Sequence, residues 1–380
     1  MTDYKYDFSD RTNSFYWQTN RQITVEELEE IFVNREQKTG KTEAKNATQF
    51  ALNQIKDPRT IKEVQDRIAQ GNINSIFPII LNNNDDNDDS NKDNEFEVKL
   101  VIRMHPKGVK NGYFHQEKLL AKLIKKNKIP TYETLYVGDN SSKLGFDFTL
   151  TNFVNGTPMS LIKDLQENKT LDENYTFQTG KFMAKINQIK TKGFGSYKLE
   201  DAKQNKLVGQ FKTLYQHITA GLEQDLDYLV KNETIDEEFK NKIKEIFETH
   251  KEIFNLKQGY IIHNDIADWN ILVNEKTQKV VGMMDLDESF SGDPVMDISA
   301  WSLFFSNERL DYLLKGYKSV TKLPHDFEIR FHIYRLRYLV SKMHLRTRRF
   351  QIKSQQEFLT PLIKRGLEVL NEEKQFFSNK

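Results

Sequence analysis

Hydrophobic and polar residues alternate over residues 96–103, the period of two that predicts a half-buried β-strand. Similar patterns predict further strands at residues 61–69, 76–81, 134–137 and 146–153. The polar segment at residues 82–95 has too few apolar side chains to bury, so we expect a solvated loop there. Because strand patterns flank this segment, it is predicted to be the tip of a long hairpin.

The second part of the chain has mostly helical spacing of apolar residues. We expect helices at residues 112–127, 174–190, 205–231, 236–257, 296–319 and 327–350, and helical structure also in the first sixty residues. A strand-rich patch at residues 259–285 is the exception. Asn155, Gly156, Thr157 and Pro158 form a strong turn signal between the sheet-rich and the helical parts. The pattern therefore predicts a bilobal α+β chain.

Composition narrows the class of protein. The 380 residues include 56 Lys and Arg against 55 Asp and Glu, so no global field attracts nucleic acid or an anionic membrane. The absence of cysteine excludes disulfides and thiolate chemistry. Neither a signal-peptide pattern nor a membrane-spanning apolar run is evident. We expect a cytoplasmic protein without nucleic-acid or membrane partners; the oligomeric state stays open.

Candidate chemistry is concentrated in residues 261–285. Apolar, strand-like residues bracket a polar loop that contains His263, Asp265 and Asn270, and a second strand pattern leads to Asp285. Phosphoryl transfer needs a carboxylate that orients or deprotonates the acceptor hydroxyl, and oxygen ligands for Mg²⁺. Asp265, Asn270 and Asp285 supply these groups.

The motif His263-x-Asp265-x4-Asn270, followed by Asp285, resembles the catalytic loop and metal-binding aspartate of the protein kinase-like superfamily. Within it, the chain looks like the aminoglycoside phosphotransferase/choline kinase-related family. Ala267 stands where Ser/Thr kinases have lysine, and Asp285-Leu286-Asp287 replaces Asp-Phe-Gly. Gly292-Asp293-Pro294 follows too soon for an activation segment of protein-kinase length.

This resemblance implies roles for individual residues. Asp265 would be the catalytic base, and His263 would hold the loop in place. Asn270 and Asp285 would bind Mg²⁺, and Asp297 would brace the loop through its backbone. The implied co-substrate is ATP or GTP, and the implied acceptor is a small-molecule alcohol.

The resemblance also places nucleotide contacts in the first part of the chain. Gly71, Asn74 and Ser75 lie in the turn where the family has its nucleotide-covering loop. Arg103 takes the position of a basic residue, more often lysine, that contacts the α/β-phosphates, and Glu117 is its candidate ion-pair partner. Thr151 and Phe153 lie in the segment that binds adenine through backbone groups.

The resulting prediction is a protein kinase-like fold. Residues 1–59 would form a helical extension, residues 60–150 the nucleotide-binding N-lobe, residues 151–156 the hinge, and residues 157–380 the helical C-lobe with catalysis and the acceptor pocket. A small-molecule kinase is the favoured function. A nucleotide-binding pseudo-kinase scaffold is the alternative, and a protein Ser/Thr kinase is disfavoured by Ala267 and the missing activation segment.

Two charged features leave the acceptor open. Asp268, Asp287 and Glu288 form an acidic cluster beside the catalytic residues, which suits a cationic acceptor. Residues 329–350 contain seven Arg and Lys and no acidic residue, which suits an anionic acceptor. Of the two interpretations of that helix, we favour a buried apolar face with a solvated basic face, because Phe331, Tyr334, Tyr338 and Leu345 lie near helical spacing.

Overall fold

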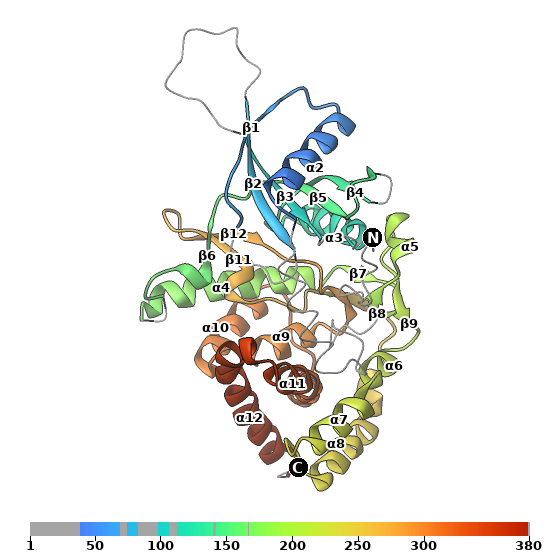
Figure 1. The fold of residues 1–380 in the computed structure, drawn as a ribbon. Helices are drawn as coiled ribbons and strands as arrows, with labels where there is room; N and C mark the ends of the chain where they lie inside the picture. The colour runs from blue at the N-terminus through green and yellow to red at the C-terminus, as the bar shows by residue number, and fades with distance from the viewer. Residues whose placement is uncertain are drawn as a thin grey trace.

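The computed structural model describes residues 39–68, 74–82, 98–105, 112–139, 142–165 and 167–378. Its N-terminal lobe is built on a five-stranded antiparallel sheet with the order β1-β2-β3-β5-β4 (Figure 1). The strands are β1 (Ile61–Val64), β2 (Ser75–Leu81), β3 (Val98–Met104), β4 (Thr134–Gly138) and β5 (Phe148–Asn152). All five lie where strand patterns predict them, although β1 is shorter than expected.

The polar segment joins neighbouring strands, as predicted. β2 and β3 pair antiparallel in continuous register from Ser75 opposite Met104 to Leu81 opposite Val98. The predicted loop lies outside the described residues except for Asn82, whose side chain donates to Thr60 Oγ1 at 2.7 Å. The insert therefore separates two strands of one hairpin.

Two helices accompany this sheet. The alanine-rich face of α2 (Lys41–Gln54) packs into the same core as Phe77, Leu100 and Phe148. Helix α3 (Phe114–Lys126) carries Glu117 in its first turn. Because α2 shares the sheet's core, it is a packed part of this lobe. The earlier portion of the predicted helical extension, residues 1–38, lies outside the described residues.

The second lobe holds two small sheets among its helices. One has the order β7-β10-β13-β8-β9 and the other the order β12-β11-β6. Their strands are β6 (Thr157–Pro158), β7 (Lys190–Thr191), β8 (Phe194–Tyr197), β9 (Gly209–Phe211), β10 (Gly259–Ile262), β11 (Ile271–Asn274), β12 (Lys279–Met283) and β13 (Phe290–Gly292). The strand-rich patch predicted within residues 259–285 is confirmed.

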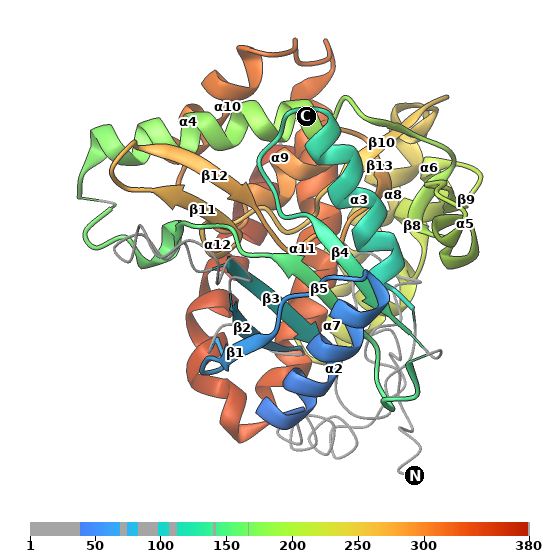
Figure 2. The same cartoon turned by 90° about the horizontal axis from the view of Figure 1, so that it is seen from above.

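Helices make up most of this lobe (Figures 1 and 2). They are α4 (Lys169–Ile186), α5 (Leu199–Lys203), α6 (Leu214–Thr219), α7 (Leu222–Lys231), α8 (Glu237–Thr249), α9 (Val295–Trp301), α10 (Asn307–Lys318), α11 (Phe327–Phe350) and α12 (Gln356–Ser378). A single large hydrophobic core, with Trp301, Tyr334 and Tyr338 fully buried, holds them together. No helix among the described residues is long and apolar enough to cross a membrane.

The long helix predicted at residues 205–231 is wrong. This stretch contains strand β9 and the two helices α6 and α7, separated at Gly221 by a left-handed backbone with φ of 67°. Gly209 packs its backbone directly on Phe194, where a Cβ would come within 2.4 Å of the carbonyl oxygen. Sheet pairing thus overrides the local helical spacing. The helix predicted at residues 296–319 is likewise divided into α9 and α10.

Gly193, Phe194 and Gly195 lead into and build strand β8. Gly193 and Gly195 have φ values of 63° and 78°, which only glycine adopts without strain. These two positions allow β8 to pass between β13 and β9 with very close backbone contact.

The favoured interpretation of residues 329–350 is wrong in one respect. The apolar face is buried as expected, but the basic residues are not solvated. Arg335, Arg337, Arg346, Arg348 and Arg349 are each less than 10% exposed. Arg337 donates to Asp225 at 3.2 Å and Arg335 to Glu373 at 2.8 Å, so carboxylates from other helices supply the counter-charges. The helix lies in the interior rather than at the surface.

Candidate active site

A tight loop follows strand β10. Residues 263–270, here called the catalytic loop, run from the end of β10 through the short 3-10 helix η4 (Asp268–Asn270) into β11. Asn264 has a φ of 71°, so the chain reverses sharply at the start of the loop. This geometry brings Asp265 and Asn270 close to each other within the loop.

Asp297 of helix α9 fixes this turn. Its carboxylate accepts hydrogen bonds from the backbone N–H groups of His263 at 3.0 Å and Asn264 at 2.8 Å. Asn187 donates a third bond at 2.7 Å. Burial raises the pKa of Asp297, while His263 and these donors oppose the rise. The contact predicted for Asp297 is therefore present.

His263 ties the loop to the second strand of the site. The imidazole is fully buried, and its Nε2 lies 3.0 Å from the carbonyl oxygen of Met284, the residue before Asp285. Since a peptide carbonyl only accepts, Nε2 carries the proton in this contact. His263 thus occupies the position of the loop-holding residue that was expected.

Asn270 and Asp265 contact each other directly. The side-chain amide of Asn270 donates to Asp265 Oδ2 at 2.7 Å and to the Asp265 carbonyl at 2.8 Å. Both bonds use Nδ2. Among the described residues nothing donates to Asn270 Oδ1, so this oxygen is available to a cation.

Asp285 meets the N-lobe through Arg103. Asp285 has a φ of 59°, and its carboxylate accepts from Arg103 Nη2 at 3.1 Å. The same guanidinium contacts Asp287 at 3.1 Å and Glu117 at 2.7 Å. The predicted ion pair between Arg103 and Glu117 is thus present, and Arg103 also links the two lobes.

This cluster of carboxylates around one arginine shifts several pKa values. Burial opposes the charge of Arg103, but Glu117, Asp285 and Asp287 outweigh it and raise its pKa. Burial, and then the neighbouring charge of Asp287, raises the pKa of Asp285 well above its usual range. Asp285 therefore lies where additional positive charge would be stabilised.

The predicted nucleotide loop is only partly described. Gly71 lies outside the described residues, and Ser75 is buried at the start of β2. Asn74 is buried beside the arginine: in the amide orientation that satisfies both neighbours, it accepts from Arg103 at 2.9 Å and donates to His105 at 2.7 Å. Asn74 thus orients Arg103 in this structure.

The two candidate adenine contacts lie at the C-terminal end of strand β5, an interior strand of the N-lobe sheet. Thr151 is a residue of β5 paired with Val101 and Thr134. The backbone N–H of Phe153 donates to the carbonyl of Lys99 at 3.1 Å, so this amide already has a partner. Nucleotide contacts at both positions stay predictions.

Two of the three residues in the acidic cluster expected beside the catalytic residues, Asp268 and Asp287, are neutralised by arginines. Asp268 forms a bidentate ion pair with Arg309 of α10, with hydrogen bonds of 2.9 and 3.0 Å. Arg309 also contacts Asp172 of α4 at 2.9 Å. Asp287 is paired with Arg103. Sequence reasoning missed Arg309, because no local spacing signals a partner 41 positions away.

An aromatic group also escaped sequence reasoning. Trp269, in the catalytic loop, is 41% exposed and meets the ring of Phe304 edge-on at 5.4 Å. The sequence could have indicated Trp269, because it stands between the polar residues Asp268 and Asn270 of the predicted site. No comparable feature of the sequence indicates Phe304.

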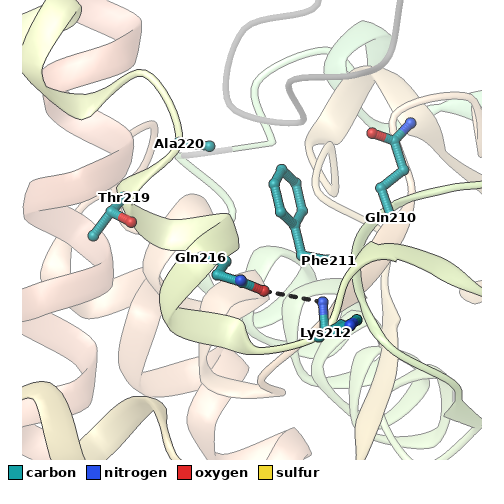
Figure 3. A pocket seen from close by; sticks show the side chains of 6 residues that line it. All are labelled: Gln210, Phe211, Lys212, Gln216, Thr219 and Ala220. Atoms are coloured by element: carbon teal, nitrogen blue, oxygen red, sulfur yellow. Dashed lines mark hydrogen bonds between the residues drawn. The ribbon is translucent and has the colours of Figure 1, made fainter.

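Two of the cavities on the described surface lie in the C-lobe. The first, of about 560 Å³, lies at β9 and α6, and Figure 3 shows its six lining residues: Gln210, Phe211, Lys212, Gln216, Thr219 and Ala220. The second, of about 450 Å³, lies between the 3-10 helix η3 (Lys251–Phe254) and the start of α11. Neither includes a residue of the catalytic loop.

The lobes and the loop between β10 and β11 together define a protein of the kinase-like fold class. Solved structures share it. A thermostable mutant of aminoglycoside phosphotransferase APH(4)-Ia, in a ternary complex with AMP-PNP and hygromycin B, matches with a TM-score of 0.56 and 14% identity, over 84% of this chain and 96% of that one. The predicted bilobal α+β fold is confirmed.

Two further structures agree. Wild-type aminoglycoside 2′-phosphotransferase-IIIa with GDP has a TM-score of 0.52 and 16% identity, over 87% of this chain and 97% of that chain. A putative aminoglycoside phosphotransferase from Ralstonia eutropha has a TM-score of 0.58 and 14% identity, over 86% and 98%. At these identities the likeness concerns the fold.

The chain belongs to the phosphotransferase enzyme family, whose family model matches residues 86–332. This membership confirms the predicted family and the predicted enzyme class, that of a small-molecule kinase. No protein of curated function matches the chain by sequence.

Proposed function

We propose that this enzyme transfers the γ-phosphoryl group of ATP or GTP to a hydroxyl group of a small molecule, with Asp265 as the catalytic base. The observation that carries the proposal is the proximity of the loop with Asp265 and Asn270 to the segment with Asp285. Asn270 contacts Asp265, and the N–H of Met284, the residue before Asp285, donates to the carbonyl of Asn270 at 2.8 Å. Arg103 contacts Asp285. The nucleotide and aminoglycoside complexes of the similar structures support the same class of reaction.

The donor atoms fit magnesium. Asn270 Oδ1 and the second carboxylate oxygen of Asp285 accept no hydrogen bond from any described residue, and Mg²⁺ prefers carboxylate and amide oxygens. Bound there, the metal would neutralise charge on the β- and γ-phosphates. Asn270 and Asp285 are the residues that would hold it.

The contacts around Asp265 support its proposed role as the base. Its carboxylate is oriented by Asn270, and the backbone around it is held by Asp297. In the proposed reaction Asp265 orients the acceptor hydroxyl and takes its proton as the oxygen attacks phosphorus. The ADP oxygen leaves from the opposite side.

Arg103 has a separate role. In this structure its guanidinium is held by Glu117 and the two aspartates that follow β12. Arginine donates two parallel hydrogen bonds to phosphate. We assign it to the α/β-phosphates, with Glu117 as its anchor on α3.

The test is Asp265→Asn, which keeps the size of the side chain but removes its charge and basicity. We expect turnover, measured as ADP formation with Mg²⁺ and nucleotide, to fall about 10²- to 10⁴-fold. Nucleotide affinity and melting temperature should stay near native, because Asp265 is not assigned to the metal.

Asp311→Asn makes the same chemical change on the exposed face of α10 and serves as the control. Native turnover in Asp265→Asn would contradict the proposal. It would favour a nucleotide-binding pseudo-kinase scaffold instead.

A further inference from the structure

Arg346 is a buried cation without a carboxylate partner among the described residues. It is 5% exposed, on the last turns of α11. Its guanidinium donates to the carbonyl oxygen of Leu362 on α12, at 2.9 Å, and faces the ring of Phe304 at 5.9 Å. No Asp or Glu of the described chain forms an ion pair with it.

Other buried arginines of the same helix differ. Arg337 is paired with Asp225, and Arg335 with Glu372 and Glu373. Burial lowers the pKa of Arg346 to about 10, and no acid in the described part of the chain offsets this effect. Arg346 still carries its charge at neutral pH. A buried charge without a counter-ion is unfavourable, so an anion from outside would be bound strongly there.

Arg346 is also connected to the catalytic loop through aromatic side chains. Phe304, which it faces, contacts the ring of Trp269 at 5.4 Å, and Trp269 directly precedes Asn270 in the catalytic loop. Two ring contacts therefore connect the guanidinium with the loop that carries Asp265. Trp269 is one of the few large hydrophobic side chains that are strongly exposed among the described residues.

Two residues of the acidic cluster are already paired with arginines. Asp268 is engaged by Arg309 and Asp287 by Arg103, each at hydrogen-bond distance. The pairing of these two acids and the absence of a carboxylate partner for Arg346 among the described residues both favour a negatively charged ligand.

We propose that the acceptor alcohol carries an anionic group, a carboxylate or a phosphate, and that Arg346 binds this group while the hydroxyl lies at Asp265. Trp269 and Phe304 form the apolar wall between the two ends of the acceptor. The inference rests on the proposed function and adds the substrate class to it. Arg346 is a specificity residue for binding, so its loss affects affinity rather than the chemical step.

The first experiment measures anion binding without turnover. Inorganic phosphate is titrated into protein saturated with Mg²⁺ and AMP-PNP, so that the nucleotide site is occupied. We expect Arg346→Met to weaken phosphate binding at least tenfold, and Arg346→Lys to retain most of it. Arg365→Met, on the more exposed face of α12, should bind like wild type. Equal phosphate affinity in wild type and Arg346→Met, or none in either, would overturn the inference.

A stability measurement identifies a purely structural role. Because Arg346 lacks a carboxylate partner in the described chain, Arg346→Met should leave the melting temperature unchanged or raise it. Arg337→Met should lower it, because the buried carboxylate of Asp225 loses its arginine partner. A fall in Arg346→Met as large as that in Arg337→Met would show that Arg346 only links α11 to α12, and would also overturn the inference. Arg346→Lys provides a second variant should Arg346→Met fail to fold.

The second experiment compares acceptors in matched pairs: glycerol with glycerate, and glucose with glucose 6-phosphate. In wild type the anionic member of at least one pair should have a kcat/KM at least tenfold higher than that of its neutral counterpart. The pair that shows this preference identifies the anionic group as a carboxylate or a phosphate. Arg346→Met should abolish this preference by raising KM with little change in kcat. Preference for neutral acceptors, or for choline as a cationic one, would contradict the anionic class. Failure of the proposed function itself would appear separately, as native turnover in Asp265→Asn.

Discussion

Several buried charges in this protein are neutralised by partners that are distant in the sequence. Arg309 holds Asp268 and Asp172, and Arg337 holds Asp225 with no exposure of either side chain. A buried ion pair of this kind contributes little net stability, but breaking it leaves an uncompensated charge. Positioning is therefore the main consequence: Arg309 anchors the catalytic loop to α4 and α10.

The buried His217 of α6 should make the stability of the protein depend on pH. Burial, assisted by the charge of Arg337, lowers its pKa from 6.5 to about 3. Between these values only the unfolded state binds the proton, so stability falls as the pH decreases below about 6.5. From pH 7 to pH 5 this one group should cost about 2 kcal/mol of unfolding free energy.

Denaturant titrations of wild type and His217→Gln at both pH values measure the effect. The difference between the two proteins removes the contribution of all other titrating groups. Stability of His217→Gln should depend less on pH, by the stated amount. Equal pH dependence in the two proteins would show that His217 is not buried in neutral form.

Among the elements, α4 and α10 cross with almost no space between their backbones. A Cβ at Gly316 would lie 1.9 Å from the carbonyl oxygen of Phe177, and one at Gly180 would lie 2.1 Å from that of Leu313. The crossing positions Arg309, at the start of α10, against Asp172 of α4 and Asp268 of the catalytic loop. Two glycines thus determine how closely α10 approaches the site.

Gly316→Ala tests this crossing. A gain in helix propensity of up to about 1 kcal/mol is expected to be outweighed by the clash, for a net loss of about 1 to 3 kcal/mol. Turnover should also fall, because Arg309 moves with α10. Lys318→Ala, on the exposed side of the same helix, should change neither property. Chemical denaturation and an ADP-formation assay give both values; an unchanged Gly316→Ala would exclude tight packing here.

At the scale of the whole molecule, Arg103 joins the lobes. It extends from β3 of the N-lobe to Asp285 and Asp287 of the C-lobe, while Glu117 and Asn74 hold it from its own side. We therefore expect nucleotide binding to change the contacts of Arg103. The phosphates would compete with the carboxylates for its guanidinium, and the metal would compete with Arg103 for Asp285.

Asp285→Asn separates the metal from this ion-pair network. We expect Mg²⁺-dependent ATP affinity to fall about 10- to 100-fold while the protein stays folded, because the strongest proposed metal ligand is lost. Isothermal titration with and without Mg²⁺ measures it.

Asp287→Asn is the matched control for that change. It also removes one partner of Arg103, but Asp287 is not assigned to the metal. An equal loss of Mg²⁺-ATP affinity in both variants would show that Arg103, rather than the metal, accounts for the effect.

Features that depend on neighbouring residues could be read from the sequence alone. The period-two alternation placed β3, helical spacing placed α11 at residues 327–350, and strand patterns on both sides of a polar loop located Asp265 and Asn270. Each depends on backbone geometry within one element or one tight turn, where local spacing determines which side chains lie together.

Long-range packing decided what the charged side chains face. The Arg309–Asp268 pair, the burial of the α11 arginines and the position of Arg346 beside Phe304 all join elements far apart in the chain. For the same reason residues 205–231 fold as β9, α6 and α7, because pairing of β9 with β8 outweighs local helical spacing. Local spacing was enough to define the class of chemistry, whereas contacts between distant elements determined which charges remain available to an acceptor.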